Sequence, residues 1–170
     1  MSRAPHLVEK TRDLILSTIK ANIAATLADV RIDRADPIVT TEPPKSYFIF
    51  DGANTYQCPA VFCVVDSIAF PEQTTGANHI NAVVKMYVSV VIEDQSADKL
   101  TIKSERYQSA LFEILHWATL QDVPKNVKIF VRVDRCDFSP IYTKKRGDDM
   151  GEFRKEVSLE LEVKHFENPN

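Results

Sequence analysis

Glycine is scarce in this sequence, and its four glycines stand well apart. A loop that wraps a phosphate group needs several glycines close together, so no such phosphate-binding loop is available. The Gly-x-Ser-x-Gly segment of serine hydrolases is absent, and no cysteine has an activating histidine close in sequence. These absences argue against the common nucleophilic and nucleotide-dependent enzymes. We expect neither catalysis nor a bound cofactor.

Cysteine and histidine are too few and too dispersed for a disulfide framework or a metal site. The cysteines form an odd set without paired spacing, which indicates free, buried thiols in a reducing cytoplasm. A zinc site needs about four converging ligands, and no two histidines are spaced to share one helical face. We therefore expect no metal ligands among Cys58, Cys63, Cys136, His6, His79, His116 and His165.

Long hydrophobic runs are missing as well. No run approaches the roughly 20 apolar residues that cross a bilayer. Charged residues from Glu9 to Asp13 interrupt the apolar positions near the N-terminus, so no signal peptide is expected. The net charge of −3 argues against a general attraction to nucleic acid or anionic lipid. We expect no membrane partner.

What the sequence does contain is the composition of a globular protein. Of its 170 residues, 44% are apolar and 26% are charged. This length suits one domain with a substantial core. We therefore treat residues 1–170 as a single domain.

The clearest pattern is a strand, an amphipathic helix and a second strand between Ala82 and Asp137. Apolar and polar residues alternate over 82–92 and again over 127–133, which is the period of a strand. Between them, residues 98–119 place their apolar side chains on one helical face. We expect that face to pack on the sheet, with Leu111, Ile114 and Leu115 against Val88, Val90, Val131 and Leu159.

The flanking segments add further elements. A first helix is predicted over 7–28, a short strand over 30–34, and an extended connector containing three prolines over 36–46. Asp51-Gly52 predicts a small hairpin of 47–50 with 56–65, in which 61–65 is apolar enough for a central strand. Residues 66–81 then form the loop of a long hairpin, and alternating residues 153–163 form the last strand.

These elements predict an α+β fold in the order α-β-β-α-β-β. Each helix and strand has a single apolar face, so the simplest packing covers one sheet face with helices. We expect a mainly antiparallel sheet of four or more strands with two amphipathic helices packed on one face. A small hairpin and an extended arm, residues 139–152, complete the fold.

Two regions are candidate interfaces. Phe48 and Phe50 share a face of the small hairpin, where they either pack inward, which we favour, or meet a partner. The arm is long for a loop inside a compact domain, and such loops tend to be functional. Its alternatives are an interaction element carrying both charge signs or a disordered insertion. The arm residues assigned to an interface are Tyr142, Lys144, Lys145, Arg146, Asp148 and Asp149.

The order of these elements resembles that of the tail terminator, or tail completion, proteins of long-tailed bacteriophages. The resemblance is carried by a first amphipathic helix, an extended connector, and the apolar segments Pro59–Val65, Val88–Asp94, Val127–Val133 and Val157–Val163. It includes the polar excursion before the last strand. It covers roughly residues 5–165 and rests on element order and hydrophobic pattern.

The resemblance implies a structural protein of the virion, assembled in the host bacterial cytoplasm. Such proteins form a ring, usually a hexamer, that ends polymerisation of the tail tube. The implied partners are further copies of the chain, the tail tube protein and a head-side connector or stopper protein, with DNA only as cargo in the channel. Two alternatives remain open: another phage neck or tail-tube component, and a small cytosolic α+β ligand-binding domain or enzyme.

Overall fold

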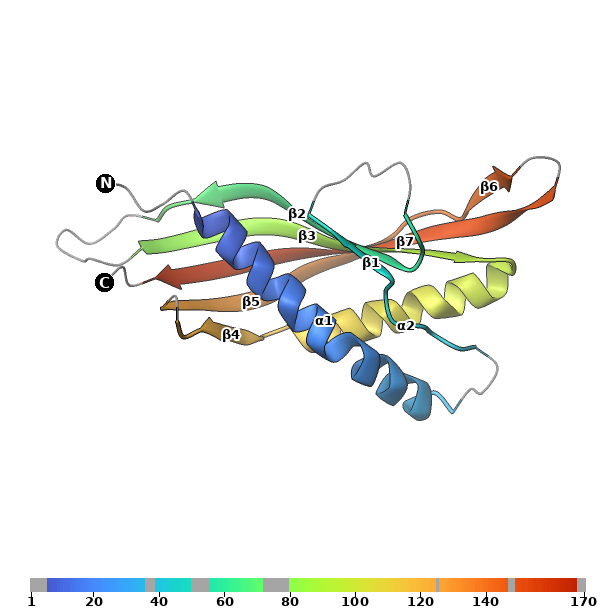
Figure 1. The fold of residues 1–170 in the computed structure, drawn as a ribbon, viewed down its shortest axis with the longest axis horizontal. Coiled ribbons are helices and arrows are strands. Elements are labelled where there is room, and N and C mark those ends of the chain that lie inside the picture. Colours follow the sequence, from blue (N-terminus) through green and yellow to red (C-terminus); the bar gives the residue numbers. More distant parts are fainter. Residues whose placement is uncertain are drawn as a thin grey trace.

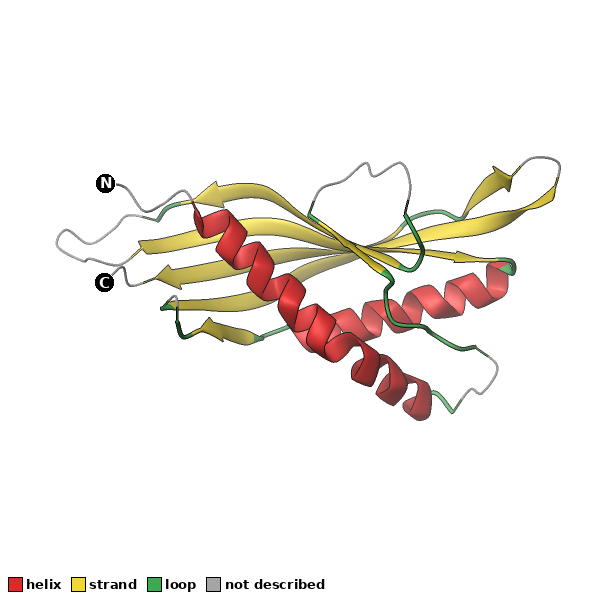
Figure 2. Cartoon of the chain, viewed as in Figure 1, coloured by secondary structure: helices red, strands yellow, loops and turns green. Residues whose placement is uncertain are grey.

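The computed structural model describes residues 6–35, 39–49, 56–71, 80–124, 126–146 and 149–167. A seven-stranded sheet is covered on one face by two helices (Figures 1 and 2). The predicted α+β fold, with a mainly antiparallel sheet and both helices on one face, is confirmed. No helix within these residues is long and apolar enough to cross a membrane.

The sheet has the strand order β1-β2-β3-β7-β5-β4, with β6 pairing to β7. Every pair is antiparallel except β1 with β2. The elements in chain order are α1 (Leu7–Asp33), β1 (Ser46–Phe48), β2 (Ala60–Ala69), β3 (Ile80–Asp94), α2 (Ala97–Leu115), β4 (Thr119–Asp122), β5 (Val127–Phe138), β6 (Tyr142–Arg146) and β7 (Asp149–Glu167).

Helix α1 is longer than predicted. Its buried stripe repeats at helical spacing through Ile19, Ile23, Leu27 and Val30. The predicted strand over 30–34 is therefore wrong, because Val30 continues the stripe and the helix runs to Asp33. Five alternating residues are too few to distinguish a strand from the last turn of an amphipathic helix.

Helix α2 begins at a cap and ends earlier than predicted. The Ser96 hydroxyl accepts a hydrogen bond from the backbone N–H of Lys99, at 3.4 Å. The helix ends at Leu115 rather than near Thr119, because Trp117 adopts a left-handed backbone conformation with φ of 60°. Thr119 already belongs to β4, an edge strand that the sequence pattern did not predict.

The predicted small hairpin is wrong. Strand β1 runs parallel to β2, with Ser46 opposite Ala60 and Phe48 opposite Phe62. Parallel strands need a crossover connection, whereas a tight turn joins antiparallel ones. Asp51 and Gly52, which suggested the turn, lie outside the described residues.

The strand at 61–65 is second from the sheet edge rather than central. Its long apolar run arises because both faces of β2 are covered at this point: Val61 and Cys63 belong to the main core, and Ala60 and Phe62 to a smaller cluster. The antiparallel pairing of β2 with β3 agrees with the long hairpin predicted there, although both strands extend into its loop.

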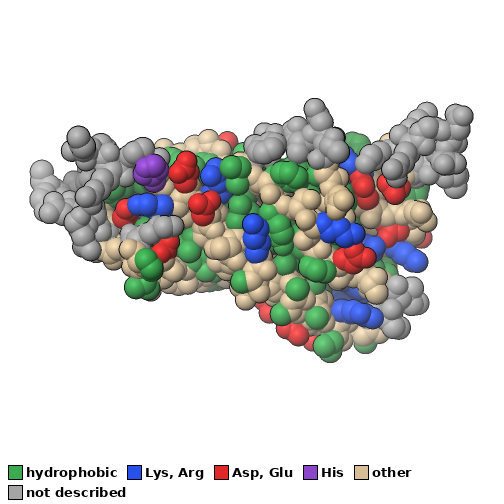
Figure 3. All heavy atoms as spheres, in the orientation of Figure 1, with side chains coloured by type: hydrophobic (Ala, Val, Ile, Leu, Met, Phe, Trp, Pro, Cys, Tyr) green, Lys and Arg blue, Asp and Glu red, His purple; other side chains and the backbone are tan. Residues whose placement is uncertain are grey.

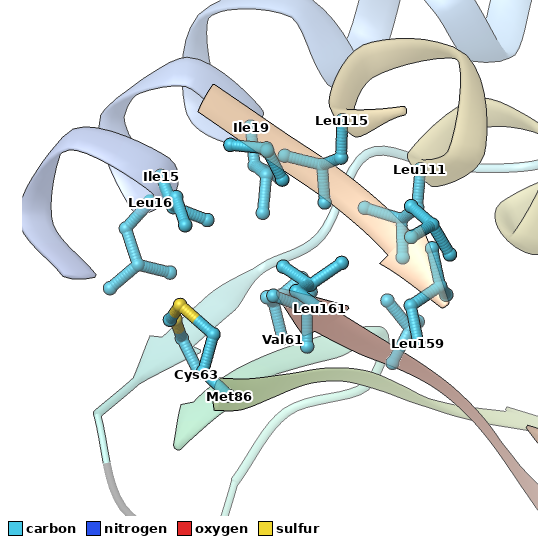
Figure 4. Close-up of a cluster of buried hydrophobic side chains, with 14 of the residues drawn as sticks. Ile15, Leu16, Ile19, Val61, Cys63, Met86, Leu111, Leu115, Leu159 and Leu161 are labelled. Carbon is cyan, nitrogen blue, oxygen red and sulfur yellow. The ribbon is translucent and has the colours of Figure 1, made fainter. Parts of the chain in front are cut away.

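The main core lies between the helices and the sheet, as the sequence predicted. Leu111 and Leu115 are fully buried and Ile114 is partly buried. Their expected partners on the sheet, Val88, Val90, Val131 and Leu159, are all buried in the same cluster. Figure 4 shows Leu111 and Leu115 pointing toward Leu159 and Leu161 of β7, with Ile15 and Ile19 of α1 alongside.

All three cysteines are free thiols. Cys63 lies in the main core, where burial raises the pKa of its thiol to about 12. Cys58 and Cys136 are half-buried. A thiol with so high a pKa stays protonated and is a poor nucleophile.

Candidate interaction surfaces

The predicted arm is the outer end of a long β-hairpin. Strands β5 and β6 lie on the same side of β7, with Phe138 opposite Val157 and Tyr142 opposite Arg154. Strand β3 accompanies β7 only as far as Phe153, so the hairpin extends past the sheet, as Figure 1 shows for β6. The sequence predicted the excursion but not the strand pairing within it.

Apolar side chains are exposed at the base of this arm. Tyr142 is 55% exposed, and Phe138 and Ile141 are also exposed. Among the other predicted arm residues, Lys144, Lys145 and Arg146 lie in β6 and Asp149 begins β7, and only their backbone is described. Asp148 lies outside the described residues.

Phe48 packs inward, on the sheet face opposite the helices. Its ring stacks on Phe62 at 5.1 Å between centroids and meets Tyr56 edge-on at 5.9 Å. Tyr56 and Phe62 are also in edge contact, so three rings cover the outer face of β2. Phe50, the second predicted aromatic, lies outside the described residues.

This aromatic cluster is tied to the base of the arm through Arg154. The guanidinium lies 5.1 Å from the centroid of the Tyr56 ring, and its Nε donates to the Glu93 carboxylate at 2.9 Å. Burial is the largest single effect on the pKa of Arg154 and lowers it, but the hydrogen bond to Glu93 and the nearby Tyr56 and Glu93 together outweigh burial and raise the pKa. The guanidinium therefore stays charged, and it connects β7, β3 and the cluster.

Paired charges occupy the outer face of β5 and β7. Arg132 contacts Asp134 at 2.6 Å and Glu162 at 3.4 Å. One step along the strands, Arg135 makes the equivalent contacts with Asp137 at 2.7 Å and Glu160 at 3.4 Å. The hydrogen bonds that these two guanidinium groups donate to Asp134 and Asp137 raise their pKa. Ion pairs this exposed add little to stability and leave the face hydrated.

An exposed aromatic groove lies at the β4–β5 edge, and sequence reasoning missed it. Trp117 is 71% exposed, and Phe130 and Phe166 meet edge-on beside it at 5.6 Å between centroids. A shallow groove of about 360 Å³ runs between these rings. We call this surface the aromatic groove; it is lined by Trp117, Phe130, Val131, Arg132, Glu162, Lys164 and Phe166.

A sequence signal for this groove existed. Val127, Ile129 and Val131 alternate inward, so Phe130 stands at an outward position where a polar residue is usual. Phe166 stands likewise between the buried residues His165 and Glu167. Two aromatic rings at outward positions of neighbouring strands indicate an exposed apolar patch.

A buried polar network joins α1 to the end of β7. The Thr11 hydroxyl lies 2.8 Å from Nδ1 of His165, whose Nε2 lies 3.4 Å from the Glu167 carboxylate. Lys10 bonds to the same carboxylate. Burial lowers the pKa of His165, and the Glu167 carboxylate only partly offsets that effect. The network satisfies polar groups within the fold, and it is closed to a ligand because His165 has no exposed surface.

No metal centre is formed by the described part of the chain, where no three His, Cys, Asp or Glu side chains converge suitably. Another hollow on the described surface is an open groove beside the end of α1, lined by Leu27, Ile32 and Thr41 among others.

Comparison with known proteins finds similarity of fold rather than of sequence. No protein-family model matches the chain, and no curated protein matches it. A solved structure described as "Virion of native gene transfer agent (GTA) particle" contains a chain of similar fold, with a TM-score of 0.50 and 13% identity. The similarity covers 96% of this chain and 99% of that chain. The protein therefore shares its overall fold, from end to end, with a chain of a gene transfer agent virion.

Proposed function

We propose that this protein is a structural component of a phage-like virion. The observation that carries the proposal is the similarity of fold to a chain of a gene transfer agent virion, which spans nearly the whole of both chains. Because the similarity spans nearly the whole of both chains, it involves a whole subunit rather than a recurring local motif. The role so proposed is architectural and not enzymatic.

Within the virion, we propose that the protein is the tail terminator. It forms a ring of about six copies at the head-proximal end of the tail tube, stops tube polymerisation and joins the tail to the head connector. Its partners are further copies of itself, the tail tube protein and the head-side connector or stopper protein. This proposal is supported by the element order described above, together with the protruding β5–β6/β7 arm.

The surfaces of the molecule suit such a ring. A ring needs two different patches on each subunit, which meet head to tail and close by rotation. The arm, the aromatic groove and the open sheet edges offer several such patches. The net charge of −3 also suits a channel that DNA passes as cargo, because tight phosphate contacts would retard it.

A second candidate is another neck or tail-tube component of the same particle. The fold similarity favours it equally, because the description of the matched structure names the whole particle and no position within it. A tube component would add to the growing tube, whereas a terminator would stop growth.

Mass photometry and negative-stain electron microscopy of the purified protein, alone and with polymerising tail tube protein, separate these candidates. A terminator should give rings that sit at one end of each tube and stop its elongation. Incorporation along the tubes would support the second candidate. A compact monomer that does not bind the tubes would contradict both proposals.

A further inference from the structure

We propose that copies of this chain associate side by side, with the aromatic groove of one copy receiving the free edge of β2 from the next. The inference rests on the proposed ring and names two surfaces that would meet between neighbouring copies, in addition to any contact made by the arm. We call the second surface the acidic edge; it comprises Glu9 and Asp13 of α1 with Asp66 and Phe70 at the end of β2.

The aromatic groove has the composition of an interface centre. Exposed tryptophan and other aromatic anchors, set beside arginine, dominate the binding energy of protein interfaces. Trp117 is also held at a φ of 60°, a region that disfavours a bulky side chain. Strain of this kind gathers at functional sites, and here the strained residue lies exposed at the sheet edge.

The acidic edge is free to meet a partner. Strand β1 pairs only with Ala60–Phe62, so within the described residues the rest of β2 has no strand on that side. Phe70 is 56% exposed, and Asp66 is exposed beside it. The side chains of Glu9 and Asp13, one turn apart on α1, are 60% and 63% exposed, with Glu9 3.3 Å from the His6 ring and Asp13 3.9 Å from the Arg12 guanidinium. Figure 3 shows acidic side chains over the start of α1, interspersed with basic ones and a histidine.

The two surfaces lie at the same level of the sheet. One cross-strand row runs from Ala69 through Val83 and Lys164 to Phe130, and Phe70 adjoins its first residue. A neighbouring row runs from Ser67, beside Asp66, to Arg132, passing through Lys85 and Glu162. A second copy placed alongside without a shift along the strands therefore brings Phe70 level with Phe130 and Asp66 level with Arg132.

The charges of the two surfaces are complementary. Lys128 lies over the Phe130 ring, 4.9 Å from its centroid, and Lys164 lines the groove together with the Arg132–Glu162 pair. Arg132 also contacts Asp134, so the excess positive charge comes from the two lysines. The opposite surface carries the carboxylates of the acidic edge. Complementary charges across an interface set its register and exclude wrong partners.

The contact joins side chains rather than extending the sheet. The ladder between β2 and β3 shifts between Val65 and Ser67, which leaves Asp66 in a bulge. The groove side has a similar shift between Val133 and Arg135. Bulges and charges at sheet edges block continuous strand pairing, which would otherwise form open-ended aggregates. Two different patches meeting head to tail can close into a ring.

Single substitutions test the two surfaces. Trp117→Ala and Phe70→Ala should each abolish the ring in mass photometry at concentrations where the wild-type protein assembles. Ile32→Ala is the matched control, because Ile32 is 73% exposed but lies at the far end of α1. The melting temperatures of all three variants should stay close to that of the wild-type protein, because each side chain is exposed.

A charge exchange tests the pairing itself. Asp66→Lys should weaken assembly at least tenfold, and adding Arg132→Glu in the same chain should restore most of it. Photo-crosslinking from p-benzoyl-phenylalanine at position 70 should label a peptide containing Trp117 or Phe130 of another copy. Such a crosslink identifies the occupant of the groove directly.

The possible failures are distinguishable. If the wild-type protein stays monomeric with and without tail tubes, the proposed ring fails and the inference fails with it. If it forms rings that Trp117→Ala and Phe70→Ala leave intact, the ring stands and the inference is overturned. Crosslinks from position 70 to the tube protein or to the connector would likewise overturn it.

Discussion

His165 is a buried titratable group at the end of β7. Its ring lies between the Thr11 hydroxyl and the Glu167 carboxylate, which also bonds to Lys10. The hydroxyl can donate to a neutral ring, or it can donate to the Leu7 carbonyl oxygen and accept from a protonated ring. Hydrogen bonds are therefore available in both forms, yet burial disfavours the cation and lowers the pKa of His165.

We expect the free energy of unfolding to decrease as the pH falls below about 6.5, the ordinary histidine value. His165 takes up its proton near that pH in the unfolded chain but only at lower pH in the folded protein. The stabilisation that depends on a neutral His165 is therefore fully present above the unfolded pKa and is lost as the pH falls from there through the lower, folded pKa. Urea unfolding at several pH values measures the slope. His165→Gln should flatten it, because the buried imidazole is then absent. An unchanged slope in His165→Gln would contradict the assignment.

Leu115 tests the contact between helix and sheet. It is fully buried near the end of α2, so Leu115→Ala should lower the free energy of unfolding by about 2–5 kcal/mol. Urea denaturation measures this loss. Val123→Ala, at a 71% exposed position, should cost under about 0.5 kcal/mol. A loss for Leu115→Ala as small as that would show that the helix packs through another face.

For single residues, the sequence predicts well which apolar side chains are buried. It predicts poorly which polar side chains are buried among them. The alternation of Val157, Leu159 and Leu161 predicts that they face inward, and all three are buried. His165 continues the same buried face, yet a histidine and a glutamate after the last valine look like a strand leaving the core. Their burial depends on Thr11 and Lys10, which lie at the other end of the chain.

The helices and strands that carry a clear residue pattern of their own were predicted. The strands that exist only because they pair with a strand distant in sequence were not. Helix α2 and strands β3, β5 and β7 each carry a clear period of their own. Strand β4 has four residues and exists because it pairs with β5. Strand β1 runs parallel to β2, and no local residue pattern specifies direction across a crossover. The arm was expected as an excursion, but its pairing with β7 was not.

Shortening the arm tests its role. Replacing residues 141–150 with Asn-Gly should leave the melting temperature nearly unchanged, because Ile141 and Tyr142 are exposed while Phe153, packed against the core, is kept. Ring formation or capping of tail tubes should fail, because the arm then no longer reaches a neighbouring subunit or the tube. Electron microscopy with tail tubes measures both. If the shortened protein still assembles and caps, the arm is dispensable.

On the scale of the whole molecule, the aromatic groove forms only once the sheet has folded. The aromatic groove combines Trp117 after α2 with Phe130 of β5 and Phe166 of β7. These three residues are dispersed in sequence, and only the strand order brings them together. The arm, by contrast, is one continuous segment, so its residue pattern alone is enough to suggest an interface.

The assembled form should weaken as salt is raised. Charged contacts at the sheet edges are screened over about 10 Å at 0.1 M salt and about 3 Å at 1 M. The aromatic contacts are unaffected by this screening, so we expect partial and not complete dissociation. Analytical ultracentrifugation across this range measures the change. Assembly that strengthens steadily with salt would show that apolar contacts alone hold the ring together.

The length of β7 has a mechanical consequence. Its 19 residues are flanked by β3 on one side and by β5 and then β6 on the other. Ladder hydrogen bonds lie perpendicular to antiparallel strands, so a force drawn along β7 from the arm loads all of them at once in shear. Peeling the hairpin sideways would break them one at a time. The arm therefore withstands a force applied along β7 far better than a force applied across it.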